Sequence, residues 1–259
     1  MAGSLLSTIR DLHRRRARER RGLALAEGVR LVEEALAAGV PIPGAAVAPG
    51  LETTPRGTAL KSALDRAGVR LERVTDAELD TLADTEQPQG VVAVIVPRVW
   101  RLEDLAPAPG RPVLVLDAVQ DPGNVGTILR TTLGLGGAGV IALKGTADLY
   151  NAKVLRGSMG ALFRLPAVAT DAPGYLAWAK ASGVEGWVTA TDGEPLGESA
   201  HADRSQAVAL ILGNEGAGVG AELSAVAHRR VAVPLGPGVE SLNVAVAAGI
   251  LLYEVARGL

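Results

Sequence analysis

The second half of the sequence alternates short apolar runs with stretches of helical spacing. Six of these runs predict β-strands, at residues 113–116, 139–143, 165–168, 186–190, 208–212 and 230–234. Helical patterns lie between most of the runs, which predicts an α/β fold with a mainly parallel sheet and helices on both faces. The last stretch, residues 241–257, predicts an apolar helix that packs against its own sheet or against a partner subunit.

The first half predicts a smaller α/β domain over residues 1–97. Its helices are expected at residues 4–21, 27–38, 58–67 and 75–82, and its strands at residues 24–27, 45–48, 69–74 and 91–96. Thr75 and Glu78 have the spacing of a capping box, which marks the start of a helix. Residues 98–112 are rich in Pro, Ala and Gly and predict a linker, so the second domain is expected over residues 113–259.

Composition narrows the classes of function. The 259 residues include no cysteine and three histidines, which excludes disulfides and thiolate metal sites, so no metal is expected. One Phe, three Tyr and three Trp provide few platforms for stacking RNA bases. No apolar run approaches the roughly 20 residues that span a bilayer, and the N-terminus lacks the order of a secretory signal. A cytoplasmic protein is therefore expected.

Charge is unevenly distributed along the chain. The formal net charge is −2, yet residues 10–21 hold seven arginines against Asp11 and Glu19. Such a patch suits a polyanion such as RNA, whereas a solvated helix face is the alternative that the sequence leaves open. The candidate RNA-binding residues of this patch are Arg10, Arg14, Arg15, Arg16, Arg18, Arg20 and Arg21.

Three segments of the second half place polar residues where a predicted strand ends and a helix begins. In residues 116–131, a turn at Asp121-Pro122-Gly123 is followed by Asn124, which is expected to cap the next helix. Arg130 lies six residues further on, about 240° around that helix from Asn124. A plain cap and a solvated charge are the alternatives for these two residues.

The other two segments, residues 210–220 and 233–249, are built alike. The first has Asn214 and Glu215 in a glycine-rich turn. In the second, a loop with two Pro and two Gly precedes Ser241, which is expected to cap a helix that holds Asn243 in its first turn. A loop this rigid suits a pre-shaped pocket for a bulky ligand such as a nucleoside. No GxGxxG opens a helix after a predicted strand, and the GxxxxGK[ST] phosphate loop is absent. Since the carboxyl ends of parallel strands meet at one edge, one shared site is expected.

Taken together, DPGNVGTILRT (121–131), LILGNEGAGVG (210–220) and VPLGPGVESLNVAVAAG (233–249) closely resemble the three signature motifs of the SpoU-type (TrmH-like) RNA ribose 2′-O-methyltransferases of the SPOUT superfamily. RGSMGALFRLP (156–166) resembles the segment between the first two motifs. RRRARERRGLALAEGVRLVEEAL (14–36) and LADTEQPQGVVAVI (82–95) resemble the family's N-terminal substrate-binding domain. The resemblance covers nearly the whole chain, with the order of the motifs preserved.

The resemblance implies S-adenosylmethionine as the methyl donor, a homodimer formed through the C-terminal domain, and a trefoil knot, which connectivity rules alone would not predict. Carried over by motif, the catalytic residues are Asn124, Arg130, Glu215, Ser241 and Asn243. The cofactor-binding residues are Leu212, Gly213, Asn214, Glu215, Val233, Leu235, Ser241 and Leu242. Ala245 stands where many relatives have Ser, and we expect little loss from that change.

The implied reaction is methylation of a ribose 2′-hydroxyl in RNA. Arg130 suits a clamp on the phosphate beside the target ribose better than a base, because a guanidinium with a pKa above about 12 holds its proton. Ribosomal RNA is expected as the substrate, with transfer RNA as the alternative. A non-catalytic RNA- or ribosome-binding protein of the same fold and a small-molecule α/β enzyme are the alternatives. Binding of S-adenosylmethionine, measured by calorimetry, separates the methyltransferase from the non-catalytic RNA-binding protein.

Overall fold

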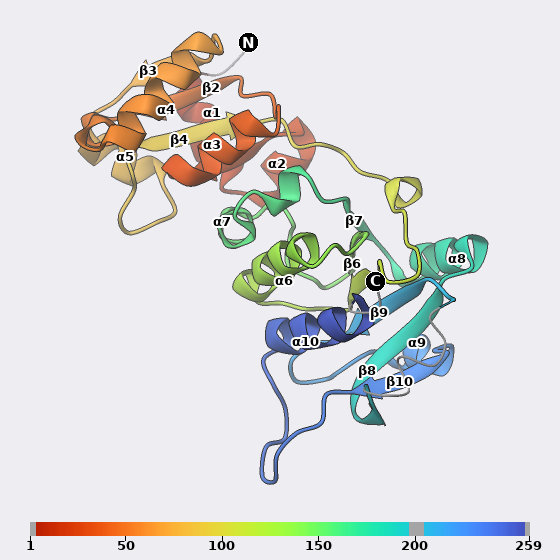
Figure 1. Ribbon diagram of the computed structural model, residues 1–259. Coiled ribbons are helices and arrows are strands. Elements are labelled where there is room, and N and C mark those ends of the chain that lie inside the picture. The colour runs from red at the N-terminus through yellow and green to blue at the C-terminus, as the bar shows by residue number, and fades with distance from the viewer. Residues whose placement is uncertain (1–3, 197–204, 257–259) are drawn as a thin grey trace. The chain divides into compact units, whose positions relative to one another are not determined.

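The computed structural model describes residues 4–196 and 205–256. Contacts divide the chain into two compact units, and Figure 1 labels their elements. The first unit is Met1–Arg98 with Tyr150–Phe163, and the second is Val99–Leu149 with Arg164–Leu259. Within the described residues, no helix is long and apolar enough to cross a bilayer.

The first unit is built on a four-stranded sheet with the strand order β1-β4-β2-β3. Its strands are β1 (Ala24–Glu27), β2 (Gly44–Val47), β3 (Arg70–Arg73) and β4 (Val91–Ile95). Its α-helices are α1 (Leu5–Leu12), α2 (Arg15–Arg21), α3 (Val29–Ala37), α4 (Pro55–Arg66), α5 (Asp76–Leu82) and α7 (Ala152–Ser158), with 3₁₀ turns η1 (Pro49–Thr53) and η3 (Ala161–Phe163). The predicted capping box of Thr75 and Glu78 is confirmed at the start of α5.

The prediction of one basic helix over residues 4–21 is wrong, because the chain leaves the helix after α1 and restarts at α2. Arg14, between them, has an extended backbone with φ −87° and ψ 128°. The buried Arg18 explains how the break is stabilised: its Nη1 donates to the carbonyl oxygens of Leu12 at 2.9 Å and His13 at 2.8 Å. These carbonyls at the end of α1 would otherwise lack partners.

Helix α7 belongs to the first unit although it lies between strands of the second unit in the sequence. It packs against β1, and Arg156 is its main polar anchor. The Arg156 guanidinium donates to Glu27 at 2.9 Å and to Asp84 at 3.0 Å. Burial raises the pKa of Glu27 above its ordinary value despite the neighbouring guanidinium. The sequence pattern makes no specific prediction for α7, and its residues are expected in the second domain, whereas the contacts group them with the first unit.

The second unit has a six-stranded sheet, β10-β8-β9-β5-β6-β7, in which every neighbouring pair is parallel. Its strands are β5 (Val113–Leu116), β6 (Gly139–Leu143), β7 (Ala167–Thr170), β8 (Glu185–Pro195), β9 (Val208–Leu212) and β10 (Arg229–Ala232). Its helices are η2 (Leu102–Asp104), α6 (Pro122–Gly134), α8 (Ala172–Ser182), α9 (Ala221–Ala225) and α10 (Val244–Ala256).

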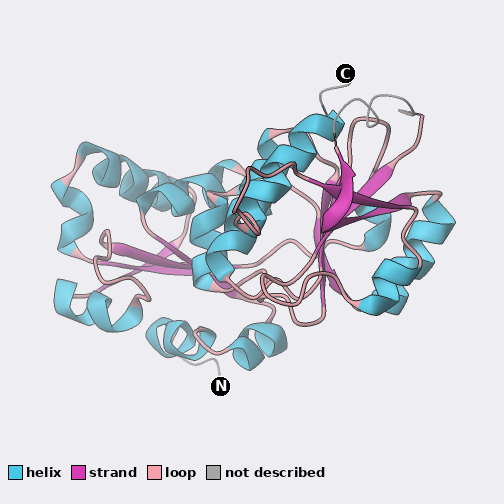
Figure 2. Ribbon diagram, turned by 90° about the horizontal axis from the view of Figure 1, so that it is seen from below, coloured by secondary structure: helices cyan, strands magenta, loops and turns pink. Residues whose placement is uncertain are grey.

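Helices cover both faces of this parallel sheet (Figure 2). Tyr175 of α8 and Leu223 of α9 share one buried cluster with Val113, Ile141 and Ile211 of the strands. Helices α6 and α10 contact each other, and α10 also contacts β9. The predicted α/β class with a mainly parallel sheet and helices on both faces is therefore confirmed, whereas the trefoil knot stays a prediction.

Candidate functional site

The site is built where strands β9 and β5, neighbours in the sheet, both end. The two loops that follow them are joined by side-chain hydrogen bonds. Asn214 donates its Nδ2 to the carbonyl oxygen of Ala118 at 3.0 Å, and Asp117 accepts from the backbone N–H of Gly220 at 2.7 Å. Ligands of open parallel sheets bind at this carboxyl edge. The two hydrogen bonds therefore hold the loops in fixed positions at the edge where a ligand would bind.

The loop after β9 is fixed from within as well. Asn214 Oδ1 accepts from the backbone N–H groups of Gly216 and Ala217, both at 3.0 Å. Gly213 has no room for a side chain, because a Cβ there would lie 2.1 Å from the carbonyl carbon of Gly218. Gly218 itself has φ +69°, which favours glycine. Gly213 and Gly218 are thus required by the shape of the turn.

A chain of two hydrogen bonds joins the three predicted segments. Asn243, just before α10, donates its Nδ2 to Asn124 Oδ1 at 2.9 Å. Asn124, in the first turn of α6, donates its Nδ2 to Glu215 Oε1 at 3.1 Å. Each of these residues comes from a different segment, and the two bonds join positions that are 119 and 91 residues apart in the sequence. The three segments therefore meet, as their place at the strand ends predicts.

Both predicted helix caps are wrong, for the same physical reason. Helix α6 begins at Pro122 and is capped by Asp121, which accepts from the N–H of Asn124 at 2.8 Å. Helix α10 begins at Val244, three residues after Ser241, and Asn243 Oδ1 accepts from the N–H of Ala245 at 2.9 Å. Each segment contains two residues able to cap. Asn124, which does not cap α6, bonds to Glu215 and Asn243 instead. Ser241, which does not cap α10, lines a neighbouring cavity. Arg257, the expected last residue of α10, lies outside the described residues.

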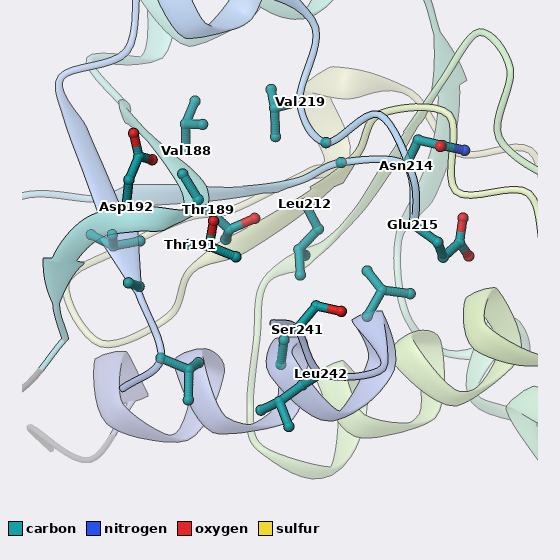
Figure 3. Close-up of a pocket in the computed structure, with 18 of the residues that line it drawn as sticks. Val188, Thr189, Thr191, Asp192, Leu212, Asn214, Glu215, Val219, Ser241 and Leu242 are labelled. Carbon is teal, nitrogen blue, oxygen red and sulfur yellow. The ribbon is translucent and has the colours of Figure 1, made fainter. Parts of the chain in front are cut away.

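A cavity of about 820 Å³ opens beside this network (Figure 3). It is formed by the ends of β8, β9 and β10, their loops, and the start of α10. All eight residues predicted to bind the cofactor line it: Leu212, Gly213, Asn214, Glu215, Val233, Leu235, Ser241 and Leu242. Asn243 lines it too, whereas Asn124 reaches it through its hydrogen bonds to Glu215 and Asn243.

One wall of the cavity was not predicted from the sequence. Strand β8 pairs Val188 with Arg230 of β10, and the next pair is Glu194 with Val231, so residues 189–193 leave the ladder. Thr189, Thr191 and Asp192, which lie in this excursion, line the cavity. The turn-forming pair Asp192-Gly193 was the one available signal that β8 departs from regular pairing.

The charges that line the cavity favour a cation. Among the described lining residues, three carboxylates (Asp192, Glu215 and Glu240) stand against the single guanidinium of Arg230. Arg230 donates to Asp192 at 2.7 Å, and this contact holds the pKa of Asp192 below its ordinary value. A ligand that carries net positive charge and a large apolar part fits such a cavity.

Comparison with known proteins identifies the family. Residues 111–253 match the profile of the SpoU rRNA Methylase family, and residues 6–93 match the MRM3-like substrate binding domain. A 23S rRNA (guanosine(2553)-2′-O)-methyltransferase of Bacillus subtilis is 39% identical, covering 95% of this chain and 93% of that protein. The chain belongs to the SpoU rRNA methylase family. It is therefore a methyltransferase that uses S-adenosylmethionine.

Other SpoU proteins agree in sequence and in structure. A 23S rRNA (adenosine(1067)-2′-O)-methyltransferase of Streptomyces laurentii is 34% identical, covering 80% of this chain and 77% of that protein. The AdoMet-bound rRNA methyltransferase of Sinorhizobium meliloti has a TM-score of 0.85 at 30% identity, covering 99% of this chain and 95% of that one. The SpoU methyltransferase AviRb of Streptomyces viridochromogenes, in complex with AdoMet, also has a TM-score of 0.85, at 29% identity, with 99% and 98% covered.

The residues of this SpoU methylase fit the cofactor. S-adenosylmethionine carries a sulfonium and an ammonium against one carboxylate, so its net charge is positive and suits the acidic cavity lining. Leu212, Leu235 and Leu242 supply an apolar surface for its nucleoside. Gly213 also lines the cavity, and the backbone of Gly218 and Val219 packed against it leaves no room for a side chain.

Arg130 is the one predicted catalytic residue that the SpoU methylase structure leaves outside the cavity and its hydrogen-bond network. It is exposed on α6, and it makes no hydrogen bond or ion pair within residues 4–196 and 205–256. An exposed guanidinium without a partner among the described residues is able to bind an anion of a ligand, such as a phosphate. Helical geometry turns it away from Asn124, as its spacing predicts.

The predicted RNA-binding arginines divide into two groups. Arg18 is buried and serves the break between α1 and α2, as described above. The other six are exposed: Arg10, Arg14, Arg15, Arg16, Arg20 and Arg21. Asp11 accepts from Arg14, Arg20 and Arg21, the last at 2.9 Å. The contacts with Arg21 and Arg14 hold the pKa of Asp11 below its ordinary value. Asp11 thus gathers guanidinium groups on one exposed surface.

Proposed function

We propose that this SpoU methylase transfers a methyl group from S-adenosylmethionine to a ribose 2′-hydroxyl in ribosomal RNA. The observation that carries the proposal is the chain from Asn243 through Asn124 to Glu215 at the edge of the cofactor cavity. It holds polar groups from all three motifs beside the place where the donor would lie. The names of the relatives, which are 23S rRNA 2′-O-methyltransferases, support the choice of substrate.

The difficult part of the reaction is activation of the ribose hydroxyl, because the donor is already reactive. The bound cofactor supplies a methyl group on a sulfonium, a good leaving group that departs neutral. A ribose hydroxyl is a poor nucleophile, so the protein must hold its oxygen in line with the methyl carbon and let its proton leave. Asn124 suits the first task, because one N–H and its carbonyl oxygen are already committed to Glu215 and Asn243, which orients the second N–H.

Ser241 and Arg130 complete the proposed site. The Ser241 hydroxyl lines the cavity and makes no hydrogen bond within the described part of the chain, so it is available to a substrate oxygen. Arg130 would grip the RNA phosphate beside the target ribose. We propose that the six exposed arginines of α1, α2 and the residue between them bind further phosphates, which gives affinity without reading sequence.

We also propose that the protein acts as a homodimer in the cytoplasm, where ribosomal RNA is its substrate. Helix α10 exposes an apolar row formed by Val246, Ile250 and Tyr253. Leu242, just before the helix, and Leu133 of α6, which α10 contacts, are exposed as well. A second copy would cover this row. Sedimentation should give a dimer for the wild type and a monomer for Ile250→Glu. A monomeric wild type would contradict the proposed assembly.

Methylation of purified RNA tests the proposed reaction. The full chain is incubated with S-adenosylmethionine labelled in its methyl group and with ribosomal or transfer RNA, and the RNA is digested to nucleosides. We expect label in a 2′-O-methylnucleoside from ribosomal RNA. Label in transfer RNA alone would favour the alternative substrate. Binding of the donor and of RNA with no transfer would instead favour a non-catalytic RNA-binding protein.

A further inference from the structure

The end of the cofactor cavity away from the hydrogen-bond network carries an ion pair that the three motifs do not include. Arg230 of β10 and Asp192 of the β8 excursion both line the cavity, with Nη2 and Oδ1 2.7 Å apart. Figure 3 shows Asp192 and Glu215 at opposite ends of the cavity. The pair therefore lies apart from the residues proposed to hold the ribose.

Strand pairing sets the position of this ion pair. Residues 189–193 leave the ladder between two consecutive partners of β10, which directs Asp192 to the cavity. The return to the ladder requires Gly193, because a Cβ there would lie 2.7 Å from the carbonyl carbon of Val231. Bulges of this kind often re-aim a side chain beside a functional site. The excursion has no role in the packed core, since Thr191, Asp192 and Gly193 are not buried.

The chemistry of the donor says what the pair can bind. Its adenosine part is uncharged, whereas its methionine end carries an α-carboxylate and an α-ammonium side by side. A carboxylate in a largely acidic cavity needs a cation, and Arg230 is the one cation among the described lining residues. The neighbouring Asp192 offers an acceptor for the ammonium.

We propose that Arg230 and Asp192 bind the α-carboxylate and the α-ammonium of the donor, and so act as positioning residues for the methyl group. This inference rests on the proposed function only in taking S-adenosylmethionine as the ligand. The sulfonium then lies between this pair and the end of the cavity marked by Glu215. The ion pair itself is weak, because its side chains are 48% and 75% exposed, and it yields readily to a ligand that satisfies both partners.

Two ligands separate this role from a structural one. S-adenosylhomocysteine has the amino acid end, whereas 5′-methylthioadenosine has the same nucleoside and thioether sulfur without it. Titration calorimetry on the full chain should show that Arg230→Gln weakens S-adenosylhomocysteine by roughly tenfold to a hundredfold, the size of a lost charge-assisted hydrogen bond. Its affinity for 5′-methylthioadenosine should stay within about twofold of the wild type.

Two further variants keep the test decisive. Arg229→Gln removes a neighbouring cation that stacks on Trp187 and does not line the cavity, so it should bind both ligands as the wild type does. Asp192→Asn changes an exposed residue that the core does not need, and it should weaken S-adenosylhomocysteine alone.

Equal losses for both ligands, or no loss for S-adenosylhomocysteine, would overturn the assignment. Because no RNA is present, a protein that binds the donor but fails to methylate ribose would refute the proposed function and leave this result standing.

Discussion

The two units of the chain use polar side chains in opposite ways. In the second unit, Asn124, Glu215 and Asn243 turn toward one another and are held beside a cavity. In the first unit, arginines such as Arg20 and Arg21 are gathered around Asp11 and remain exposed. Fixed geometry suits a reaction that needs an oxygen in line with a methyl carbon, whereas exposed charge suits a backbone of phosphates. Under the proposed function, the chemistry belongs to the second unit and much of the RNA affinity to the first.

The largest effect is expected for Arg130, an exposed cation of the second unit that we assign to the chemical step and not to general RNA affinity. Arg130→Ala should lower the methylation rate by about a hundredfold or more, since a misplaced ribose is no longer in line with the methyl group. Calorimetry should show nearly unchanged binding of S-adenosylmethionine. Arg111→Ala, another exposed arginine of this unit that does not line the cavity, serves as the control. Retained turnover by Arg130→Ala would defeat its assignment.

The exposed arginines of the first unit should affect RNA affinity and not the chemical step. Replacing Arg16 and Arg20 with Gln should weaken RNA binding and reduce the slope of log K against log salt by roughly 0.7 to 0.9 for each phosphate that is no longer neutralised. The rate at saturating RNA should stay the same. An unchanged salt slope for the double variant would show that Arg16 and Arg20 do not contact RNA phosphates.

Arg18 provides the matched contrast within the same helix. Because it is buried and donates to two carbonyl oxygens, Arg18→Ala should lower the free energy of unfolding by about 1–3 kcal/mol. Its salt slope for RNA binding, measured below the unfolding transition, should match the wild type. A smaller salt slope for Arg18→Ala would show that Arg18 also neutralises an RNA phosphate, although it is buried in the free protein.

The smallest expected effect concerns pH and the anchor of α7. Burial raises the pKa of Glu27 above its ordinary value of 4.5, so the folded state binds more protons than the unfolded chain between 4.5 and the raised value. Through that window, the Glu27 contribution to the free energy of unfolding falls as pH rises. The melting temperature of the wild type minus that of Glu27→Gln should therefore decline with increasing pH. A difference that rises with pH would contradict the raised pKa.

The elements that the sequence predicted best are the buried parallel strands. The bounds expected for β5, β6 and β9 agree with the structure, because strands covered on both faces are continuous apolar runs with sharp ends. The strand pattern also predicted that the motif loops meet at one edge of the sheet, whereas the residues expected to line the cavity came from the family resemblance. The family resemblance, rather than periodicity, supplied the cofactor.

Local sequence patterns gave wrong or incomplete predictions where contacts between distant parts of the sequence determine the structure. Asp121 and Asn124 can both cap a helix, and the hydrogen bonds of Asn124 to Glu215 and Asn243 lie far away in the sequence. The excursion of β8 was missed because it depends on pairing with β10. The location of α7 in the first unit was missed because Arg156 contacts Glu27 and Asp84, 129 and 72 positions away.

The central claim is that the three motifs form one catalytic unit, and a double-mutant cycle between two of them tests it most directly. The rate at saturating donor and RNA is measured for Asn124→Ala, Glu215→Ala and the double variant. The account predicts that each single change lowers the rate by about a hundredfold, and that the double variant is hardly slower than the slower single variant. Losses that multiply in the double variant would show that the two residues act independently, and the account of a single site would be wrong.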